Sequence, residues 1–257
     1  RKKIFDNLID VKDDGSFRLN LKYFSFYHGR STINAQFEKL FDASRRIPES
    51  DIREIDQDMA ASIQSVFNDI ILKLATTAKQ LTKSSNLVIA GGVGLNCVSN
   101  GHVAAKKIFD HVWAQPAAGD AGGALGAALY AYYNQHGFSR KIETTDQGAS
   151  HFGPSFKRDD IKHVLELFNI NYETSDSGDD LNKKTVDYLL KENVIGFFQG
   201  KMEFGPRALG ARSILGDPRS EKMQKTMNLQ IKYRESFRPF APAILKEYAQ
   251  EIFEIDY

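Results

Sequence analysis

The sequence predicts an α/β protein built from two consecutive segments. Two observations support this class: a strand, a glycine-rich turn and a helix follow one another twice between residues 86 and 138, and further helix and strand patterns return after residue 155. Repeated units of this kind place helices against a sheet. The 257 residues, 42% hydrophobic and 26% charged, suffice for a packed core and exclude collagen-like and disordered chains.

The first 81 residues begin with a strand pattern and end in a long helix. A turn signal at residues 13–16 precedes four apolar residues that alternate with polar ones, which predicts a half-buried strand over 17–23. Over residues 58–81 the apolar side chains recur at helical spacing and predict an amphipathic helix. These positions are Met59, Ile63, Phe67, Ile70, Ile71, Leu74, Ala78 and Leu81.

Two glycine-rich turns follow predicted strands. Residues 86–90 are a short apolar run that predicts a buried strand, and the next four residues read Gly-Gly-Val-Gly. A turn of this composition lets backbone approach a phosphate, although it matches neither a dinucleotide fingerprint nor a Walker A loop. We expect a helix over 98–109 and a strand over 112–114, which leads into the second glycine-rich turn at 116–123.

The helix predicted over residues 121–138 carries no charged side chain. Gly122 and Gly126 form a GxxxG pattern, which is typical of membrane helices. Leu125 and Leu129 are nevertheless its only large aliphatic residues. We therefore expect a helix that packs closely against backbone in a soluble domain.

A polar, turn-rich stretch at residues 139–156 predicts the boundary between two domains, 1–152 and 153–257. After it, Ser155 is expected to cap a helix that extends to Phe168. A strand near 170–174, a helix near 180–192 and a strand at 194–198 follow. Asp217 and Pro218 are expected to start a further helix.

Asp120 lies between Gly119 and Gly122 at the end of a predicted strand. Its short carboxylate could ligate a metal ion, or it could cap the helix that follows. The spacing alone does not separate these two interpretations. The six histidines show neither HxxxH nor HExxH spacing, and the single cysteine, Cys97, excludes an intrachain disulfide and a cysteine-based zinc site.

Positive charge concentrates in residues 201–238, which hold nine basic and four acidic side chains, a net charge of +5. Arg207 and Arg212 are surrounded by turn formers and small residues, and Arg238 lies between aromatic residues and prolines. Arginine in rigid, apolar surroundings suits bidentate binding of phosphate or carboxylate. A structural network, for example a pair of Arg234 with Glu235, is the alternative. The whole chain has 34 basic and 33 acidic residues, so we expect neither nucleic acid nor membrane as partner.

Four ordered motifs, at residues 86–97, 115–128, 203–210 and 234–242, carry a resemblance that covers almost the whole chain. They read NLVIAGGVGLNC, QPAAGDAGGALGAA, EFGPRALG and RESFRPFAP. Together they resemble the O-carbamoyltransferase family, which includes NodU-like proteins and the carbamoyltransferases of antibiotic biosynthesis. The resemblance implies the second half of an actin-like ATPase (Kae1-like) domain, followed by the first part of a YrdC-like α/β domain.

The resemblance also implies an activity and its residues. Carbamoyl phosphate and ATP would form carbamoyl-adenylate, and the carbamoyl group would pass to a hydroxyl of a small-molecule or glycan acceptor. A cytoplasmic enzyme is expected, and a homo-oligomer is compatible with it. A nucleotide would be bound by Gly91, Gly92, Asn96 and Gly119, a divalent metal (Fe or Mg) by Asp120, and phosphate groups by Arg207, Arg212, Lys232 and Arg238. Guanidinium groups neutralise polyphosphate charge and align reactants without a change of protonation.

Departures from the family pattern keep alternatives open. Nothing here matches the family's first half, which supplies a histidine pair for the metal, and the second domain ends early, at Tyr257. We therefore expect this chain to be the middle of a carbamoyltransferase and inactive alone. The alternatives are an actin-like ATPase or sugar-kinase relative, and a non-catalytic module that binds phosphate or nucleotide. A third alternative is hydrogenase-maturation or tRNA-threonylcarbamoyl chemistry, which uses related domains.

Overall fold

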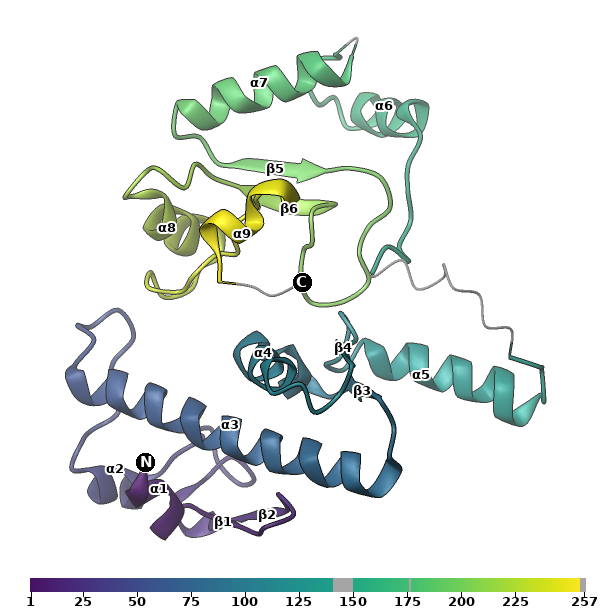
Figure 1. The fold of residues 1–257 in the computed structure, drawn as a ribbon. Helices are drawn as coiled ribbons and strands as arrows, with labels where there is room; N and C mark the ends of the chain where they lie inside the picture. Colours follow the sequence, from purple (N-terminus) through teal and green to yellow (C-terminus); the bar gives the residue numbers. More distant parts are fainter. Residues whose placement is uncertain (141–149, 176, 255–257) are drawn as a thin grey trace. The chain divides into compact units, whose positions relative to one another are not determined.

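A computed structural model describes residues 1–140, 150–175 and 177–254, and the chain divides into two compact units (Figure 1). Unit 1 consists of Arg1–Gly153 together with Glu203–Ala208, and unit 2 of Pro154–Met202 together with Leu209–Tyr257. Both units combine helices with two-stranded sheets, so the predicted mixed α/β class is confirmed. Residues 141–149 of the predicted boundary lie outside the described residues.

Unit 1 begins with five short elements. They are α1 (Lys2–Asn7), β1 (Ile9–Val11), β2 (Phe17–Leu19), the 3₁₀ turn η1 (Leu21–Tyr23) and α2 (Ala35–Phe41). β1 and β2 pair antiparallel, and the turn between them contains Gly15 at φ +87°. The strand predicted over 17–23 is correct only as far as Leu19, because the Asn20 side chain accepts a hydrogen bond from the Lys22 amide and starts η1.

The long helix α3 (Glu54–Thr82) is the centre of unit 1. Figure 1 shows it running between the N-terminal elements and the later strands of this unit. It contributes Val66 and Ile70 to one apolar cluster, and Ala75 to a second cluster. Their other buried members are Ile4, Leu8 and Ile9 in the first, and Val103 and Phe109 in the second.

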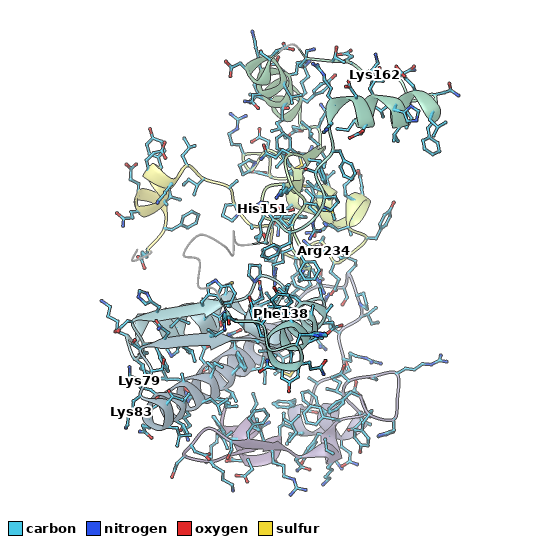
Figure 2. The ribbon with its side chains drawn as sticks, turned by 90° about the vertical axis from the view of Figure 1, so that its right-hand side faces the viewer. Lys79, Lys83, Phe138, His151, Lys162 and Arg234 are labelled. Atoms are coloured by element: carbon cyan, nitrogen blue, oxygen red, sulfur yellow. The ribbon has the colours of Figure 1, made fainter. Side chains whose placement is uncertain are left out.

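The helix predicted over 58–81 is therefore confirmed, but the predicted apolar face is partly wrong. Ile63 and Leu81 are 54% and 79% exposed, whereas Val66 is buried. Because α3 packs against two different clusters along its length, its buried side is not a single straight stripe. Lys79, labelled in Figure 2, illustrates the second contact, since its Nζ lies 5.3 Å from the centroid of the Phe109 ring.

The second part of unit 1 contains both glycine-rich turns. β3 (Asn86–Ile89) leads through the 3₁₀ turn η2 (Gly92–Leu95) into α4 (Cys97–Ala105), and β4 (His111–Ala114) pairs with β3 in parallel. α5 (Gly122–Tyr130) follows and continues as a π-helical turn, Ala131–Gln135. The predicted order of strand, turn and helix is confirmed. No helix in the described part of the chain is both long and apolar enough to cross a bilayer.

Unit 2 is organised around one antiparallel strand pair. Two helices, α6 (Arg158–Leu167) and α7 (Gly178–Leu190), precede β5 (Ile195–Phe198), which pairs with β6 (Arg212–Leu215). In Figure 1, α7 runs along one side of this pair. The remaining elements are α8 (Met223–Thr226), the π-helical turn η4 (Met227–Ile231), the 3₁₀ turn η5 (Lys246–Tyr248) and α9 (Ala249–Ile252).

Three predictions for this unit are wrong. The capping residue of α6 is Lys157 and not Ser155, because the Asp160 carboxylate accepts the Lys157 amide. The strand expected at 170–174 is absent from this described stretch, where Ile170 is 51% exposed and no sheet buries it. Asp217 does not start a helix, since its carboxylate is bound by Arg219 and the next helix begins at Met223.

Candidate functional site

The two glycine-rich turns of unit 1 meet at one edge of the β3–β4 pair. Since the two strands are parallel neighbours, their carboxyl ends lie at the same edge, where ligands of open α/β sheets commonly bind. The Gly91 amide donates a 2.8 Å hydrogen bond to the Ala118 carbonyl oxygen. A Cβ atom on Gly119 would lie 3.9 Å from the Gly92 Cα. Three of the four predicted nucleotide-binding residues, Gly91, Gly92 and Gly119, are thus neighbours.

Glycine serves different purposes within the first turn. Gly91 adopts φ +98°, a conformation that side chains with a Cβ rarely take. A Cβ on Gly91 or Gly92 would meet no heavy atom within 4 Å, so the backbone there borders open space. Gly94 is buried instead, and its Cβ would lie 3.2 Å from Ile89 Cγ2. The exposed part of the turn, Gly91–Gly92, is the part that a ligand can approach.

Asn96, the fourth predicted nucleotide-binding residue, closes this turn. Its Oδ1 accepts a 3.1 Å hydrogen bond from the Ser99 amide and caps α4. Its Nδ2 donates a 3.0 Å hydrogen bond to Gln64 Oε1 on α3. The Nδ2 group carries two N–H bonds, and the contact with Gln64 uses one of them. Sequence reasoning did not find Gln64, since a single glutamine within an amphipathic pattern gives no signal.

Asp120 lies on the second turn and is exposed. The helix after it, α5, has Ala121 as its N-cap residue and no side-chain cap, so the capping interpretation of Asp120 is wrong. No group of three or more His, Cys, Asp or Glu side chains within the described ranges could hold a metal ion. The chemistry of its carboxylate fits one ligand of a hard divalent cation, and the metal-binding role of Asp120 stays a prediction.

A short segment from the basic region completes this part of unit 1. The Phe204 amide donates a 2.6 Å hydrogen bond to the Ser150 carbonyl oxygen, and Gly205 adopts φ +131°. A Cβ on Gly205 would lie 3.1 Å from the Pro116 carbonyl oxygen. The segment that carries Arg207, whose side chain is exposed, therefore packs beside the second glycine-rich turn. Sequence reasoning missed this contact, because the two partners are 89 residues apart.

The other three predicted phosphate-binding residues belong to unit 2. Arg212 is half-buried at the start of β6, opposite Phe198. Lys232 is exposed and ends the turn η4, and Arg238 is exposed in the loop that follows. The role of these residues and of Arg207 in phosphate binding remains a prediction.

A buried asparagine holds the loop that presents Arg238. Asn228, 0% exposed, donates hydrogen bonds from Nδ2 to the carbonyl oxygens of Ser236 (3.0 Å) and Arg238 (2.7 Å). Arg234, labelled in Figure 2, donates from Nε to Asn228 Oδ1 at 2.6 Å and lies 4.8 Å from the centroid of the Phe240 ring. Arg234 is thus bound to this loop through Asn228 and Phe240, and its pairing with Glu235 stays a prediction.

Two family models match this chain. The model of the carbamoyltransferase N-terminus matches residues 1–129, and the model of the carbamoyltransferase C-terminus matches residues 186–257. The chain belongs to the carbamoyltransferase family. The first match, which ends at residue 129, includes both glycine-rich turns. The second match includes the whole basic region from residue 201 to residue 238.

Several curated relatives align with nearly all of this carbamoyltransferase-family chain. Uncharacterized protein sll1178 of Synechocystis sp. is 48% identical over 256 residues, which are 98% of this chain and 42% of the relative. Nodulation protein NolNO of Sinorhizobium fredii is 33% identical over 99% of this chain and 35% of its own length. Nodulation protein U of Rhizobium tropici is 30% identical over 97% of this chain and 41% of its own length. The chain therefore spans less than half of these relatives.

Proposed function

We propose that this chain is part of an ATP-dependent O-carbamoyltransferase. In the proposed reaction, carbamoyl phosphate, ATP and water give carbamoyl-adenylate with release of phosphate and pyrophosphate. The carbamoyl group then passes from the adenylate to a hydroxyl of a small-molecule or glycan acceptor, and AMP is released. Membership of the carbamoyltransferase family supports carbamoyl transfer. The use of ATP and the class of acceptor rest on the resemblance of the four sequence motifs.

The observation that carries the nucleotide part is the contact of the two glycine-rich turns. Gly91 N–H is bonded to Ala118 O, and the space above Gly91 and Gly92 is open. Backbone without side chains at the carboxyl edge of parallel strands lets a phosphate approach closely. We propose that Gly91, Gly92 and Gly119 contact the nucleotide there, and that Asn96 does so through its second Nδ2 hydrogen.

We propose that four positively charged residues bind phosphate groups. Arg207, Arg212, Lys232 and Arg238 would neutralise phosphate oxygens and align the reacting groups. Arginine offers a fixed fork of N–H donors that matches two phosphate oxygens at once. Asp120 would supply one oxygen ligand to a divalent Fe or Mg ion, and such an ion would add positive charge beside the phosphates of a nucleotide bound at the glycine-rich turns. We further propose that residues 1–152 correspond to the second half of a Kae1-like domain, and residues 153–257 to the first part of a YrdC-like domain.

Calorimetric titration of the chain with ATP, carbamoyl phosphate and pyrophosphate tests the proposal. We expect ATP to bind, and Gly92→Val, which places a branched side chain in the open space above the turn, to weaken ATP binding at least tenfold. Gly126→Val in α5 is the matched control, because a Cβ there also meets no heavy atom within 4 Å. Equal ATP affinity of Gly92→Val and the unchanged chain would remove the nucleotide from this turn.

A turnover assay separates the transferase from its main alternative. Pyrophosphate release is followed with ATP alone and with ATP plus carbamoyl phosphate. We expect this chain by itself to give no turnover, and a complete carbamoyltransferase that contains it to need carbamoyl phosphate. Phosphate release from ATP that does not depend on carbamoyl phosphate would favour an actin-like ATPase or kinase relative instead.

A further inference from the structure

Four polar side chains form a closed hydrogen-bond network directly under the first glycine-rich turn. Gln64 and Asn68 come from α3, and Asn96 and Ser99 from the start of α4. Gln64 Nε2 donates to Asn68 Oδ1 (2.8 Å) and to Ser99 Oγ (2.9 Å), and Ser99 Oγ donates to Asn68 Oδ1 (2.7 Å). We refer to these four residues as the amide network.

Gln64 is the member that connects α3 to the turn. Its Nε2 points to Asn68 and Ser99, while its Oε1 accepts the 3.0 Å hydrogen bond from Asn96 Nδ2. Ser99 is 1% exposed, so these bonds form where water competes little. Loss of Gln64 would leave Asn96 Nδ2 without this acceptor and Ser99 Oγ without this donor.

The network fixes the side of the turn away from the open space. Asn96 Oδ1 is held by the Ser99 amide, and Asn100 Nδ2 donates a 2.7 Å hydrogen bond to the Gly94 carbonyl oxygen. The Gly94 and Asn96 amides are bonded in turn to the carbonyl oxygens of Gly91 and Val93. These hydrogen bonds connect Gln64 through Asn96 to the backbone of residues 91–96.

An apolar residue at position 64 would attach α3 equally well if packing were the only requirement. Elsewhere α3 is attached in that way, through Val66, Ile70 and Ala75. Hydrogen bonds differ from apolar contacts because they select one orientation of the Asn96 amide and one course of the turn. Buried polar networks that are fully satisfied rigidify their surroundings and specify one conformation.

We propose that Gln64 is a positioning residue for the nucleotide: it orients the Asn96 side chain and holds the backbone of residues 91–96 in the conformation that receives phosphate. This inference rests on the proposed function, since it assigns ATP to that turn. Gln64 itself does not touch the ligand in this proposal. It acts through Asn96, whose second Nδ2 hydrogen it directs.

The test compares Gln64→Met with Gln80→Met in the same chain. Gln80 is exposed on the same helix, so its variant controls for the loss of an amide and for the new side chain. Hydrogen exchange is measured on peptides covering 91–100 and on peptides covering α3. ATP affinity is measured by calorimetry, and far-ultraviolet circular dichroism checks the helices.

We expect Gln64→Met to accelerate exchange of the Gly94, Asn96 and Ser99 amides at least fivefold and to weaken ATP binding about tenfold, with unchanged circular dichroism. Gln80→Met should change neither quantity. Gln64→Glu keeps an acceptor for Asn96 Nδ2 and should restore slow exchange of the turn.

Unchanged exchange at 91–96 in Gln64→Met, or ATP affinity within twofold of the unchanged chain, would overturn the inference. A third outcome is that Gln64→Met exchanges faster but the unchanged chain does not bind ATP. That result would overturn the proposed nucleotide site instead. A general loss of helicity would assign Gln64 to folding and would also overturn the positioning role.

Discussion

The Gly91 amide and the Ala118 carbonyl oxygen are joined by a 2.8 Å hydrogen bond that links the two glycine-rich turns of unit 1. Gly91 makes this bond with a backbone φ of +98°. We expect Gly91→Ala to cost about 1–2 kcal/mol of unfolding free energy, because alanine is strained at this φ. Chemical denaturation measures this loss, and ATP titration should show weaker binding.

Gly101→Ala is the control for Gly91→Ala. Gly101 lies inside α4, and a Cβ there would meet no heavy atom within 4 Å. Alanine in a helix interior is expected to add about 0.5–1 kcal/mol of stability. A destabilisation by Gly101→Ala as large as that by Gly91→Ala would show that backbone strain is not the cause.

Two adjacent glycines at the start of α5 should respond in opposite ways. A Cβ on Gly122 would lie far inside contact distance of the Ala117 carbonyl oxygen, whereas a Cβ on Gly123 would meet no heavy atom within 4 Å. Ala117 is 1% exposed, so its backbone has little room to move. We expect Gly122→Ala to destabilise by about 2 kcal/mol or more and Gly123→Ala to be neutral or mildly stabilising. Thermal melting of both variants tests this difference.

Arg207→Ala should abolish adenylate formation without unfolding the protein. The side chain is exposed, and we propose that it neutralises phosphate charge in the reaction. In a complete carbamoyltransferase that contains this segment, we expect pyrophosphate release to fall at least about 100-fold, the effect typical of a lost charge-stabilising donor. Arg207→Lys should recover only part of the rate, because lysine lacks the fork. Lys201→Ala, also exposed, is the control, and an unchanged rate in Arg207→Ala would exclude Arg207 from the reaction.

Unit 2 should lose stability in acid through Asp217. Hydrogen bonds from the Arg219 guanidinium and backbone amide lower the pKa of Asp217 from 3.8 to about 2. Because the pKa is lower in the folded state, the pair stabilises at neutral pH, and this contribution disappears as the pH falls from about 4 to about 2. Asp217→Asn should melt at a lower temperature than the unchanged chain at pH 7. This difference in melting temperature should become smaller below pH 4.

A matched pair exists in unit 1 for this acid experiment. The Arg53 side chain lowers the pKa of Asp56 to about 2 through its hydrogen bonds. For Asp56→Asn, the difference in the melting temperature of unit 1 from that of the unchanged chain should therefore also become smaller in acid. A difference in melting temperature that stays the same from pH 7 to pH 2 in either variant would contradict the assigned pKa shift.

Asn228 should be among the most sensitive positions of unit 2. Asn228→Leu would deprive the Ser236 and Arg238 carbonyl oxygens of their Nδ2 donor and Arg234 Nε of its acceptor in a fully buried place. We expect a loss of about 2–4 kcal/mol by denaturant unfolding. Gln224→Leu removes a donor to the same Arg238 oxygen from an exposed side chain and should cost about 1 kcal/mol or less. Similar losses in both variants would show that burial of Asn228 is not decisive.

Local patterns predicted most of the elements but only part of the candidate site. The periodicity of α3 and the apolar run of β3 are properties of adjacent residues, so the sequence alone was sufficient for them. The contacts between Gly205 and Pro116, and between Gln64 and Asn96, join residues far apart in the chain. The strand expected at 170–174 failed for a related reason, because alternating residues form a strand only where a partner strand accepts their hydrogen bonds.

The segment Glu203–Ala208 has a practical consequence for dividing this protein. These six residues belong to unit 1, although the stretch that precedes them, Pro154–Met202, belongs to unit 2. A piece that ends at residue 153 would therefore lack the loop segment that packs against Pro116 and Ala117. The separately expressed piece 1–153 would miss this native contact, and it should regain its compactness when a peptide of sequence EFGPRA, residues 203–208, is supplied.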